Sequence, residues 1–439
     1  MKMNFMLAML PLMVATSVWA ADTPENAALI KRGEYLAIAG DCTACHTAPG
    51  ADKTAKFGGG YPLASPFGVI YGTNISSDKE FGIGNWTDDE FVRAVREGVG
   101  KEGQQLYPAM PYDAFTKMKR EDVLAIKAYL MSQPAVHSAG PQTDLSFPFN
   151  QRWGMRVWKW FNFDKGELKN DPSKSAEWNR GAYLVEALEH CGTCHTPRTL
   201  TMGMDTDNAF SGGDLGSWVA FNITPDKNAG IGNWSQEELV TYLKTGFVAG
   251  KASASGAMGE AIEHSLQHLS DSDLNAIATY IRSVPAVGDD KQTKPRDEWG
   301  QKNQDVYPVR AQGLSMDKSA AALFNASCAA CHGKGGEGIG EGFHAYPSLF
   351  NHSSTGSYDN RNQVSVILNG VQRHMEKGEV MMPSFANQLD DEQIATLSNY
   401  VSQQFGNPAA ATVTAKDVAK MRKAADLTSP PKIEEGTQK

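Results

Sequence analysis

The pentapeptide C-x-x-C-H occurs three times and constrains this chain more than any other feature. The three copies consist of Cys42, Cys45 and His46; of Cys191, Cys194 and His195; and of Cys328, Cys331 and His332. Two thiols three positions apart can each add to a vinyl group of one haem, and the adjacent histidine then lies under the ring as an axial iron ligand. The pattern therefore predicts a c-type haem at each copy.

The cysteine count argues against the other meanings of this motif. A single copy would also fit half of a zinc site or a thioredoxin-like redox pair. The chain has six cysteines, and every one of them lies in a copy. A zinc site with four cysteine ligands would consume two whole copies, and no cysteine remains for a disulfide. We therefore expect three covalently bound haems c.

The length of the chain fits one haem per domain. A chain of 439 residues holds about three domains, and the first cysteines of successive copies are 149 and 137 residues apart. The formal net charge of −9 argues against a nucleic acid as partner.

Residues 1–20 have the pattern of a secretory signal peptide. Lys2 precedes an apolar run, and Ala20 ends the segment at the expected cleavage site. The run is too short to favour an uncleaved anchor, since a membrane span needs about 20 apolar residues. No later stretch is long and apolar enough to span, so we expect a mature chain that is soluble or peripheral outside the cytoplasm.

The first two haem domains are predicted to be an internal duplication. The sequence Arg-Gly-x-Tyr-Leu begins at Arg32 and again at Arg180, each time ahead of a C-x-x-C-H copy. The sequence Gly-Ile-Gly-Asn-Trp ends at Trp86 and again at Trp234. Repeated stretches of this kind indicate two copies of one structural unit. The third domain lacks the Gly-Asn-Trp block and is predicted to be a single small cytochrome module.

Helix signals follow each repeated block. Thr87 with Glu90, and Ser235 with Glu238, have the spacing of a capping box. Terminal helices are predicted over 121–132, 271–283 and 391–403. The predicted fold class is therefore mainly α, with three tandem cytochrome c-like haem domains.

The predicted organisation follows from these patterns. It comprises a signal peptide over 1–20, a first domain over 21–136, an aromatic-rich connector over 137–179, a second domain over 180–286, a linker over 287–314, a third domain over 315–407 and a tail over 408–439. The linker is polar and is expected to be exposed. The tail is expected to form a short helix followed by a disordered end.

One methionine in each domain is the candidate sixth iron ligand, because small c-type cytochromes close the haem with a methionine from the opposite side. Met110 lies 64 residues after His46, and Met258 lies 63 residues after His195. Met382 lies 50 residues after His332 and, like Met110, precedes a proline. The competing residues are His264, His268, His374, Met375 and Met381.

The connector between the first two domains is rich in aromatic residues. They are Phe147, Phe149, Trp153, Trp158, Trp160, Phe161 and Phe163, and they alternate with Arg152, Arg156 and Lys159. Such a stretch is typical of a docking or membrane-surface patch. It would equally suit packing between the first and second domains, and both interpretations stand at this point.

In combination, these stretches resemble the three-haem cytochrome c subunits of membrane-bound bacterial dehydrogenases. That family serves gluconate 2-dehydrogenase, sorbitol and related flavin dehydrogenases, and quinoprotein alcohol dehydrogenases. The matching stretches are 32–36 with 40–42, 71–75, 106–112, 180–184 with 191–198, 263–271, 328–332 and 381–385.

The resemblance implies an electron-transfer subunit that is not catalytic alone. Its partners would be an FAD-type or PQQ-type catalytic subunit, a small third subunit, and ubiquinone as the acceptor. The implied location is the periplasmic side of the inner membrane, with peripheral attachment after signal peptide cleavage. The implied proximal ligands are His46, His195 and His332, and the implied distal ligands are Met110, Met258 and Met382.

Two other functions remain open at this point. A stand-alone periplasmic electron carrier would have the same haem motifs but no dedicated dehydrogenase. A multihaem peroxidase would need one five-coordinate iron, and hence one domain without a usable distal methionine. Six-coordinate His/Met iron leaves no open site for a substrate, so the candidate ligands favour electron transfer.

Overall fold

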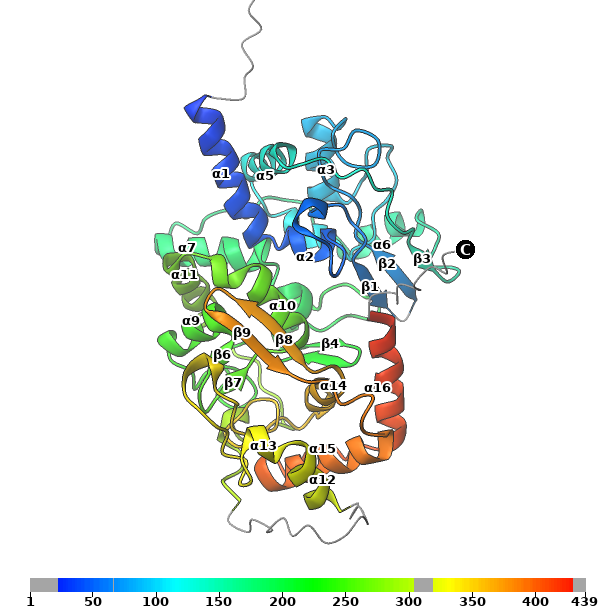
Figure 1. Ribbon diagram of the computed structural model, residues 1–439. Coiled ribbons are helices and arrows are strands. Elements are labelled where there is room, and N and C mark those ends of the chain that lie inside the picture. The colour runs from blue at the N-terminus through cyan, green and yellow to red at the C-terminus, as the bar shows by residue number, and fades with distance from the viewer. Residues whose placement is uncertain (1–22, 66, 304–318, 429–439) are drawn as a thin grey trace, which may run out of the picture.

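Three mainly helical units follow one another along the chain, and the second lies between the other two (Figure 1). The computed structural model describes residues 23–65, 67–303 and 319–428. The predicted signal peptide and the end of the predicted tail lie outside the described residues. The mainly α fold class predicted from the sequence is confirmed.

The first unit places its haem motif on a short helix that follows a long one. Its elements are α1 (Pro24–Ala39), α2 (Cys42–His46), α3 (Asp88–Glu97), α4 (Tyr112–Phe115) and α5 (Arg120–Ser132), with β1 (Pro62–Ser65), β2 (Gly68–Tyr71) and β3 (Asp144–Leu145) in one antiparallel sheet. α3 begins at the predicted capping box, in which the Thr87 side chain accepts from the Glu90 N–H. The connector continues from β3 into α6 (Gly154–Asn162).

The second unit repeats this order. Its elements are α7 (Ala176–Tyr183), α8 (Gly192–His195), α9 (Gln236–Thr245), α10 (Gly256–His264) and α11 (Asp271–Ile281), with the hairpins β4 (Gly213–Leu215) to β5 (Trp218–Ala220) and β6 (Phe247–Val248) to β7 (Ala252–Ser253). A π-helical segment, Leu184–Leu188, continues α7 toward the motif. The capping box of Ser235 and Glu238 is also present.

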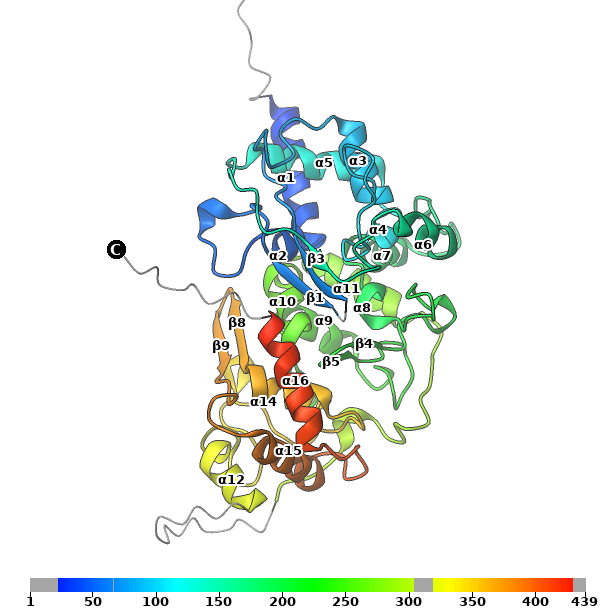
Figure 2. The same cartoon turned by 90° about the vertical axis from the view of Figure 1, so that its right-hand side faces the viewer.

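The third unit is smaller and includes part of the predicted tail. Its elements are α12 (Ala320–Ser327), α13 (Ala329–His332), α14 (Arg361–Asn369), α15 (Asp391–Phe405) and α16 (Ala415–Thr428), with the hairpin β8 (Val371–Met375) to β9 (Gly378–Met382). α16 packs on α14 and α15 and reaches β1 of the first unit (Figure 2). Val418 of α16 is fully buried, so this helix belongs to the core of the third unit.

The opening and closing helices of each duplicated unit cross at a glycine. A Cβ on Gly33 would lie 1.9 Å from the Ala125 carbonyl oxygen, and a Cβ on Gly181 would lie 1.9 Å from that of Ala276. α1 therefore packs directly on α5, and α7 on α11, at a distance that no larger residue permits. The duplication inferred from Arg-Gly-x-Tyr-Leu thus has a physical basis, because its glycine sets the helix crossing.

The second unit is in contact with both of the others. Its helix α10 packs against α2, which bears the first haem motif, and against β8 of the third unit. Residues of the first and second units share one hydrophobic core, which includes Leu36, Met118, Leu184 and Leu274. The three haem motifs therefore belong to one docked body.

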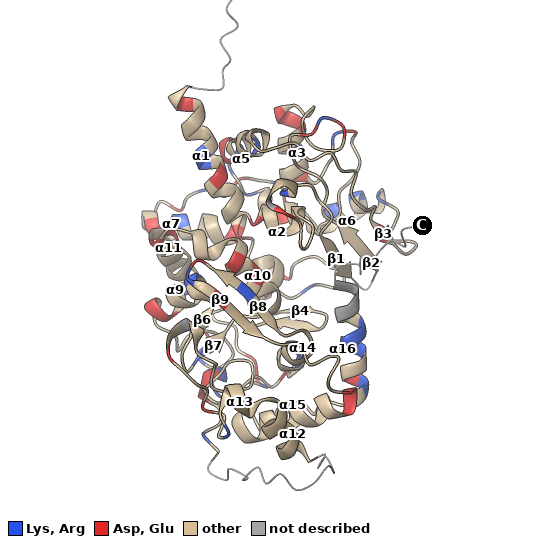
Figure 3. Ribbon diagram, viewed as in Figure 1, with Lys and Arg blue, Asp and Glu red and all other residues tan. Residues whose placement is uncertain are grey.

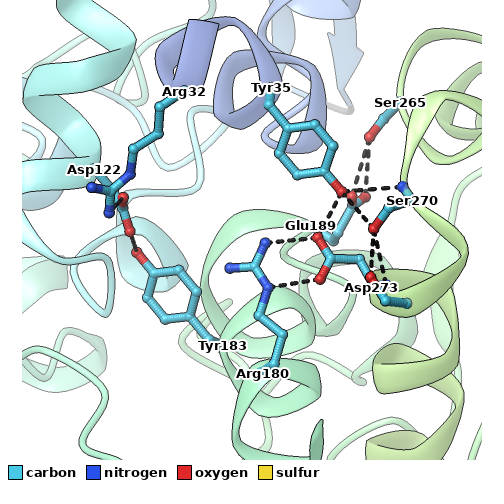
Figure 4. A network of polar contacts seen from close by, with 10 residues as sticks. Arg32, Tyr35, Asp122, Arg180, Tyr183, Glu189, Ser265, Ser270 and Asp273 are labelled. Carbon is cyan, nitrogen blue, oxygen red and sulfur yellow. Dashed lines mark hydrogen bonds and ion pairs between the residues drawn. The ribbon is translucent and has the colours of Figure 1, made fainter. Parts of the chain in front are cut away.

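At the interface of the two duplicated units, a tyrosine of each unit donates a hydrogen bond to an aspartate of the other (Figure 4). Tyr35 of α1 donates to Asp273 of α11, and Tyr183 of α7 donates to Asp122 of α5, each at 2.6 Å. Tyr35 and Tyr183 occupy the same position in the duplicated sequence, so each unit reaches into the other in the same way. The contact has the reciprocity of an isologous dimer interface, although both halves lie in one chain.

Each of these aspartates is also held by an arginine of its own unit. Arg180 donates to both carboxylate oxygens of Asp273, at 2.8 and 2.7 Å, and Arg32 pairs with Asp122. Burial opposes ionisation of Asp273, but the bonds from Arg180 and Tyr35 outweigh it and lower its pKa. Tyr35 therefore donates to an ionised carboxylate, which is a stronger acceptor than a neutral group.

We predict that Tyr183→Phe lowers the free energy of unfolding by about 1.5 to 3 kcal/mol, because it removes a buried hydrogen bond to a charged group. Urea unfolding followed by tryptophan fluorescence measures the change. Tyr346→Phe is the matched control, since Tyr346 is 46% exposed. Equal midpoints for the two variants would contradict the role of Tyr183 at the interface.

Candidate haem sites

Each motif histidine is oriented by a hydrogen bond to the backbone. Nδ1 lies 2.7 Å from the Thr73 oxygen for His46, 2.6 Å from the Phe221 oxygen for His195, and 2.8 Å from the Pro347 oxygen for His332. A carbonyl oxygen can only accept, so Nδ1 carries the proton and Nε2 keeps its lone pair. Burial lowers the pKa of all three imidazoles. Neutral histidines with a free Nε2 are suited to bind haem iron.

A glycine braces each motif from its other side. The N–H groups of Gly59, Gly212 and Gly338 donate to the carbonyl oxygens of His46, His195 and His332, each at 2.8 Å. All three glycines have positive φ, at 79°, 110° and 74°. Other residues rarely adopt this backbone conformation, which explains the glycine at each position. The glycine-rich turns therefore form part of the candidate haem sites.

The cysteine environments favour haem attachment over the alternatives. Burial raises the pKa of Cys42, Cys45 and Cys328 to about 12, which disfavours the thiolate that redox catalysis and zinc binding require. No cluster of three or more His, Cys, Asp or Glu side chains in the described part of the chain is placed to hold a metal ion.

At the second site, all four residues predicted to hold the haem line one cavity. Cys191, Cys194, His195 and Met258 line it together, and we call it the second-site cavity. Met258 lies in the first turn of α10. The walls of the second-site cavity include the apolar side chains of Ile231, Trp234, Leu239, Leu266 and Ile277. An imidazole nitrogen, a thioether and two cysteines around an apolar space are the donor set and surroundings that a haem c needs.

The other two methionine candidates lie outside helices, in contrast to Met258. Met110 lies in the turn before α4 and packs against the shared core of the first two units. Met382 ends β9 and is half-buried. Their axial roles stay predictions, as does the role of Met258.

The rival histidines have other contacts. Nδ1 of His268 lies 3.1 Å from Glu376, and Nδ1 of His374 lies 2.9 Å from Glu263. These contacts join α10 and its neighbouring turn to the β8–β9 hairpin, away from the second-site cavity. Met381 is 68% exposed, which makes it a poor candidate for a buried iron ligand.

Two buried carboxyl groups lie beside the first cysteines of the duplicated motifs. Asp41 precedes Cys42, and Glu189 lies two residues before Cys191. Burial, followed by the charge of Glu260, raises the pKa of Asp41 well above its ordinary value. Burial, followed by the charge of Asp41, also raises the pKa of Glu189 well above its ordinary value. The Glu189 carboxyl accepts a hydrogen bond from the Ser265 hydroxyl at 3.2 Å. Burial thus disfavours the charged form of both carboxyl groups.

Several residues around the second-site cavity were missed by sequence reasoning. Arg296, Ser353, Ser354 and Asn362 line it, although all four lie outside the second haem domain. Arg296 falls in the predicted linker, and it is only 8% exposed, contrary to the expectation of an exposed segment. No spacing pattern connects these residues to the motif at Cys191, so the fold was needed to find them.

The fold and the sites define a cytochrome c. A family model described as cytochrome c matches residues 30–134 and 318–405, which lie in the first and third units. Curated proteins match nearly the whole chain. This chain is 43% identical over 430 residues to the fructose dehydrogenase cytochrome subunit of Gluconobacter japonicus, and the match covers 94% of this chain and 87% of that protein.

Two further relatives are similar over nearly the whole chain. The gluconate 2-dehydrogenase cytochrome c subunit of Pantoea cypripedii is 38% identical over 434 residues, covering 95% of each chain. The cytochrome c subunit of the quinone alcohol dehydrogenase of Gluconobacter oxydans is 35% identical over 437 residues, covering 96% of this chain and 88% of that one. The chain therefore belongs to the family of dehydrogenase cytochrome c subunits.

We predict that Met258→Ala removes the sixth ligand from the iron of the second site. One haem should lose its low-spin spectrum and titrate at a lower reduction potential, because methionine ligation raises the potential. Absorption spectra and a potentiometric titration measure both effects. Met381→Ala is the control and should change neither. An unaltered Met258→Ala spectrum would make His264 or His268 the better candidate ligand.

Proposed function

We propose that this chain carries electrons through three covalent haems c, from a flavin or quinoprotein dehydrogenase subunit toward ubiquinone. The dehydrogenase would oxidise a CH–OH group of a sugar acid, polyol or alcohol. The names of the relatives support a catalytic partner of this kind, since they are cytochrome subunits of fructose, gluconate and alcohol dehydrogenases.

The second-site cavity is the observation that carries the proposal. With His195 and Met258 at the same cavity, the iron there would have both axial positions filled by the chain. A haem bound there would supply reversible one-electron chemistry, and with His195 and Met258 as its ligands this site would leave no iron position for a substrate. The apolar walls exclude water, and the backbone bond to His195 fixes the imidazole. These features support electron transfer over peroxidase activity.

We predict that the purified chain, loaded with haem, oxidises no fructose, gluconate or ethanol in the presence of an artificial electron acceptor. Isolation of the chain from its native membranes should recover a catalytic dehydrogenase with it, and substrate added to that complex should reduce its haems. Turnover by the pure chain would overturn the proposal. A chain that never co-purifies with a dehydrogenase would be a stand-alone carrier.

We further propose a peripheral position on the periplasmic side of the inner membrane. No helix in the described part of the chain is long and apolar enough to cross a membrane. An aromatic patch supports surface attachment instead. It comprises Phe147, Phe149, Trp153, Val157, Trp160 and Phe161 of the connector, together with Leu200 and Met202. All eight side chains are exposed, with Trp160 at 82% and Phe147 at 79%.

The two interpretations of the connector apply to opposite faces of α6. Trp158 is turned inward, where its Nε1 donates to the Thr201 oxygen at 3.0 Å and its ring packs edge-on against Tyr112. Lys159 also points inward and donates to the carbonyl oxygens of Glu97 and Gly98. The bond to Thr201 places the loop with Leu200 and Met202 next to α6.

Charge favours a lipid bilayer as the occupant of the aromatic patch. Residues 145–163 contain two exposed basic residues, Arg152 and Arg156, and no acidic residue, in a chain whose net charge is −9. Figure 3 shows basic positions in blue near the α6 label, while both basic and acidic positions occur along the rest of the ribbon. Exposed aromatic rings with arginines suit the headgroup region of an anionic membrane.

We predict that the double variant Trp160→Ser with Phe161→Ser weakens binding to vesicles of phosphatidylglycerol and phosphatidylcholine at least tenfold, because it removes two of the most exposed rings. Co-sedimentation measures the binding. Ile339→Ser with Tyr346→Ser, which removes exposed apolar residues elsewhere, should have no effect. If the patch variant keeps its vesicle binding but loses a co-purifying dehydrogenase, the patch is a protein interface and the membrane assignment is wrong.

A further inference from the structure

The second-site cavity is completed by segments that follow the second haem domain. Arg296 comes from the short turn Arg296–Glu298, and Ser353, Ser354 and Asn362 come from the third unit. Asn362 is tied to β5, since it accepts from the Val219 N–H at 2.8 Å and donates to the Val219 oxygen at 2.9 Å. The haem site of the second domain is therefore closed only when the third unit docks.

Arg296 is the buried cation at this cavity. One of its terminal nitrogens donates to the Ala229 oxygen, and the other donates to the Asn222 oxygen at 3.3 Å. The guanidinium carbon lies 4.5 Å from the centre of the Phe221 ring. Nε is buried and has no hydrogen-bond partner among the described residues. One face of this side chain thus has a donor that nothing in the described protein satisfies.

The neighbouring carboxylate does not satisfy that donor. Asp297 accepts from Lys251 at 2.7 Å and from Asn233 at 3.0 Å, and it forms no ion pair with Arg296. Burial lowers the pKa of Arg296 to about 10, so the guanidinium is still charged at neutral pH. A buried charge without an anionic partner is costly, and an anion with good hydrogen-bond geometry reduces that cost.

We propose that Arg296 binds a propionate of the haem attached at Cys191 and Cys194, and so raises the reduction potential of that haem. A haem offers carboxylates at the edge of its ring, and Nε of Arg296 offers an unused donor at the wall of the same cavity. A buried positive charge disfavours ferric iron, because oxidation adds charge of the same sign nearby. The proposal rests on the proposed function, since it requires a haem in the second site.

The first domain has no counterpart of this arginine. Asn74 donates to the Val136 oxygen and Asn222 to the Val287 oxygen, both at 2.7 Å. Val136 and Val287 are therefore equivalent positions in the segments that follow the two duplicated domains. The residue nine positions after Val136 is Leu145, whereas the residue nine positions after Val287 is Arg296. By this spacing, the position of a buried arginine at the second site is held by a leucine in the first domain.

The test is a potentiometric titration of the full chain carrying its haems. Arg296→Gln should lower the midpoint of one haem, the same haem that Met258→Ala perturbs, and should leave the others unchanged. Arg296→Lys keeps the charge and should retain most of the midpoint. Arg373→Gln is the matched control, because Arg373 is 2% exposed and donates to the Gly246 oxygen at 3.0 Å without lining the cavity. Its shift should be clearly smaller.

The outcomes separate this proposal from the proposed function. Unchanged midpoints in Arg296→Gln with every haem in place, or an equal shift in Arg373→Gln, would overturn the role of Arg296 alone. Absence of a haem at Cys191 and Cys194 in the wild-type chain would overturn the proposed function itself. If Arg296→Gln does not fold, resonance Raman spectra of Arg296→Lys replace it. The propionate bending band of one haem should then shift from its wild-type position, and an unshifted band would refute the contact.

Discussion

The bond from each motif histidine to a backbone carbonyl is the interaction on which the candidate sites depend. The accepting residue lies 27, 26 and 15 positions from the histidine in the three units. The haem motif therefore cannot be arranged by its own five residues, because the rest of the domain must bring the carbonyl into place. Each candidate iron ligand is therefore oriented only when its unit folds.

Docking of the units extends this dependence across the chain. α10 bears Met258 and contacts both the helix of the first motif and the β8–β9 hairpin of the third unit. Tyr35 and Tyr183 fix the relative position of the first two units, since each donates to an aspartate of the other unit that an arginine also contacts. An electron carrier benefits from such rigidity, because its redox centres must keep their separation while electrons pass.

Local patterns in the sequence predicted local structure well. The capping boxes at Thr87 and Ser235, and the mainly α fold, were predicted from spacing alone and are present in the structure. Met258 and His195, which spacing paired as candidate ligands, line one cavity, and their axial roles stay predictions. The glycine bond to the motif carbonyl could have been suspected from the repeated glycine-rich stretches, but their composition alone predicts only turns.

Contacts between remote segments were beyond the reach of sequence reasoning. Arg296 lies in a polar stretch whose composition predicts an exposed linker, yet its side chain donates to Ala229 and Asn222 of the second unit and is buried there. The connector was ambiguous for a related reason. Trp158 and Trp160 are the same residue type two positions apart, yet one packs inward and the other is 82% exposed. Composition predicts an aromatic stretch, whereas the fold decides which face of it stays available.

The number of covalent haems per chain tests the central claim most directly. A pyridine haemochrome assay on the denatured mature protein, combined with its protein concentration, measures that number without reference to a partner or substrate. The account predicts three haems, one for each motif with an oriented histidine. Two or fewer in a fully matured preparation would contradict it.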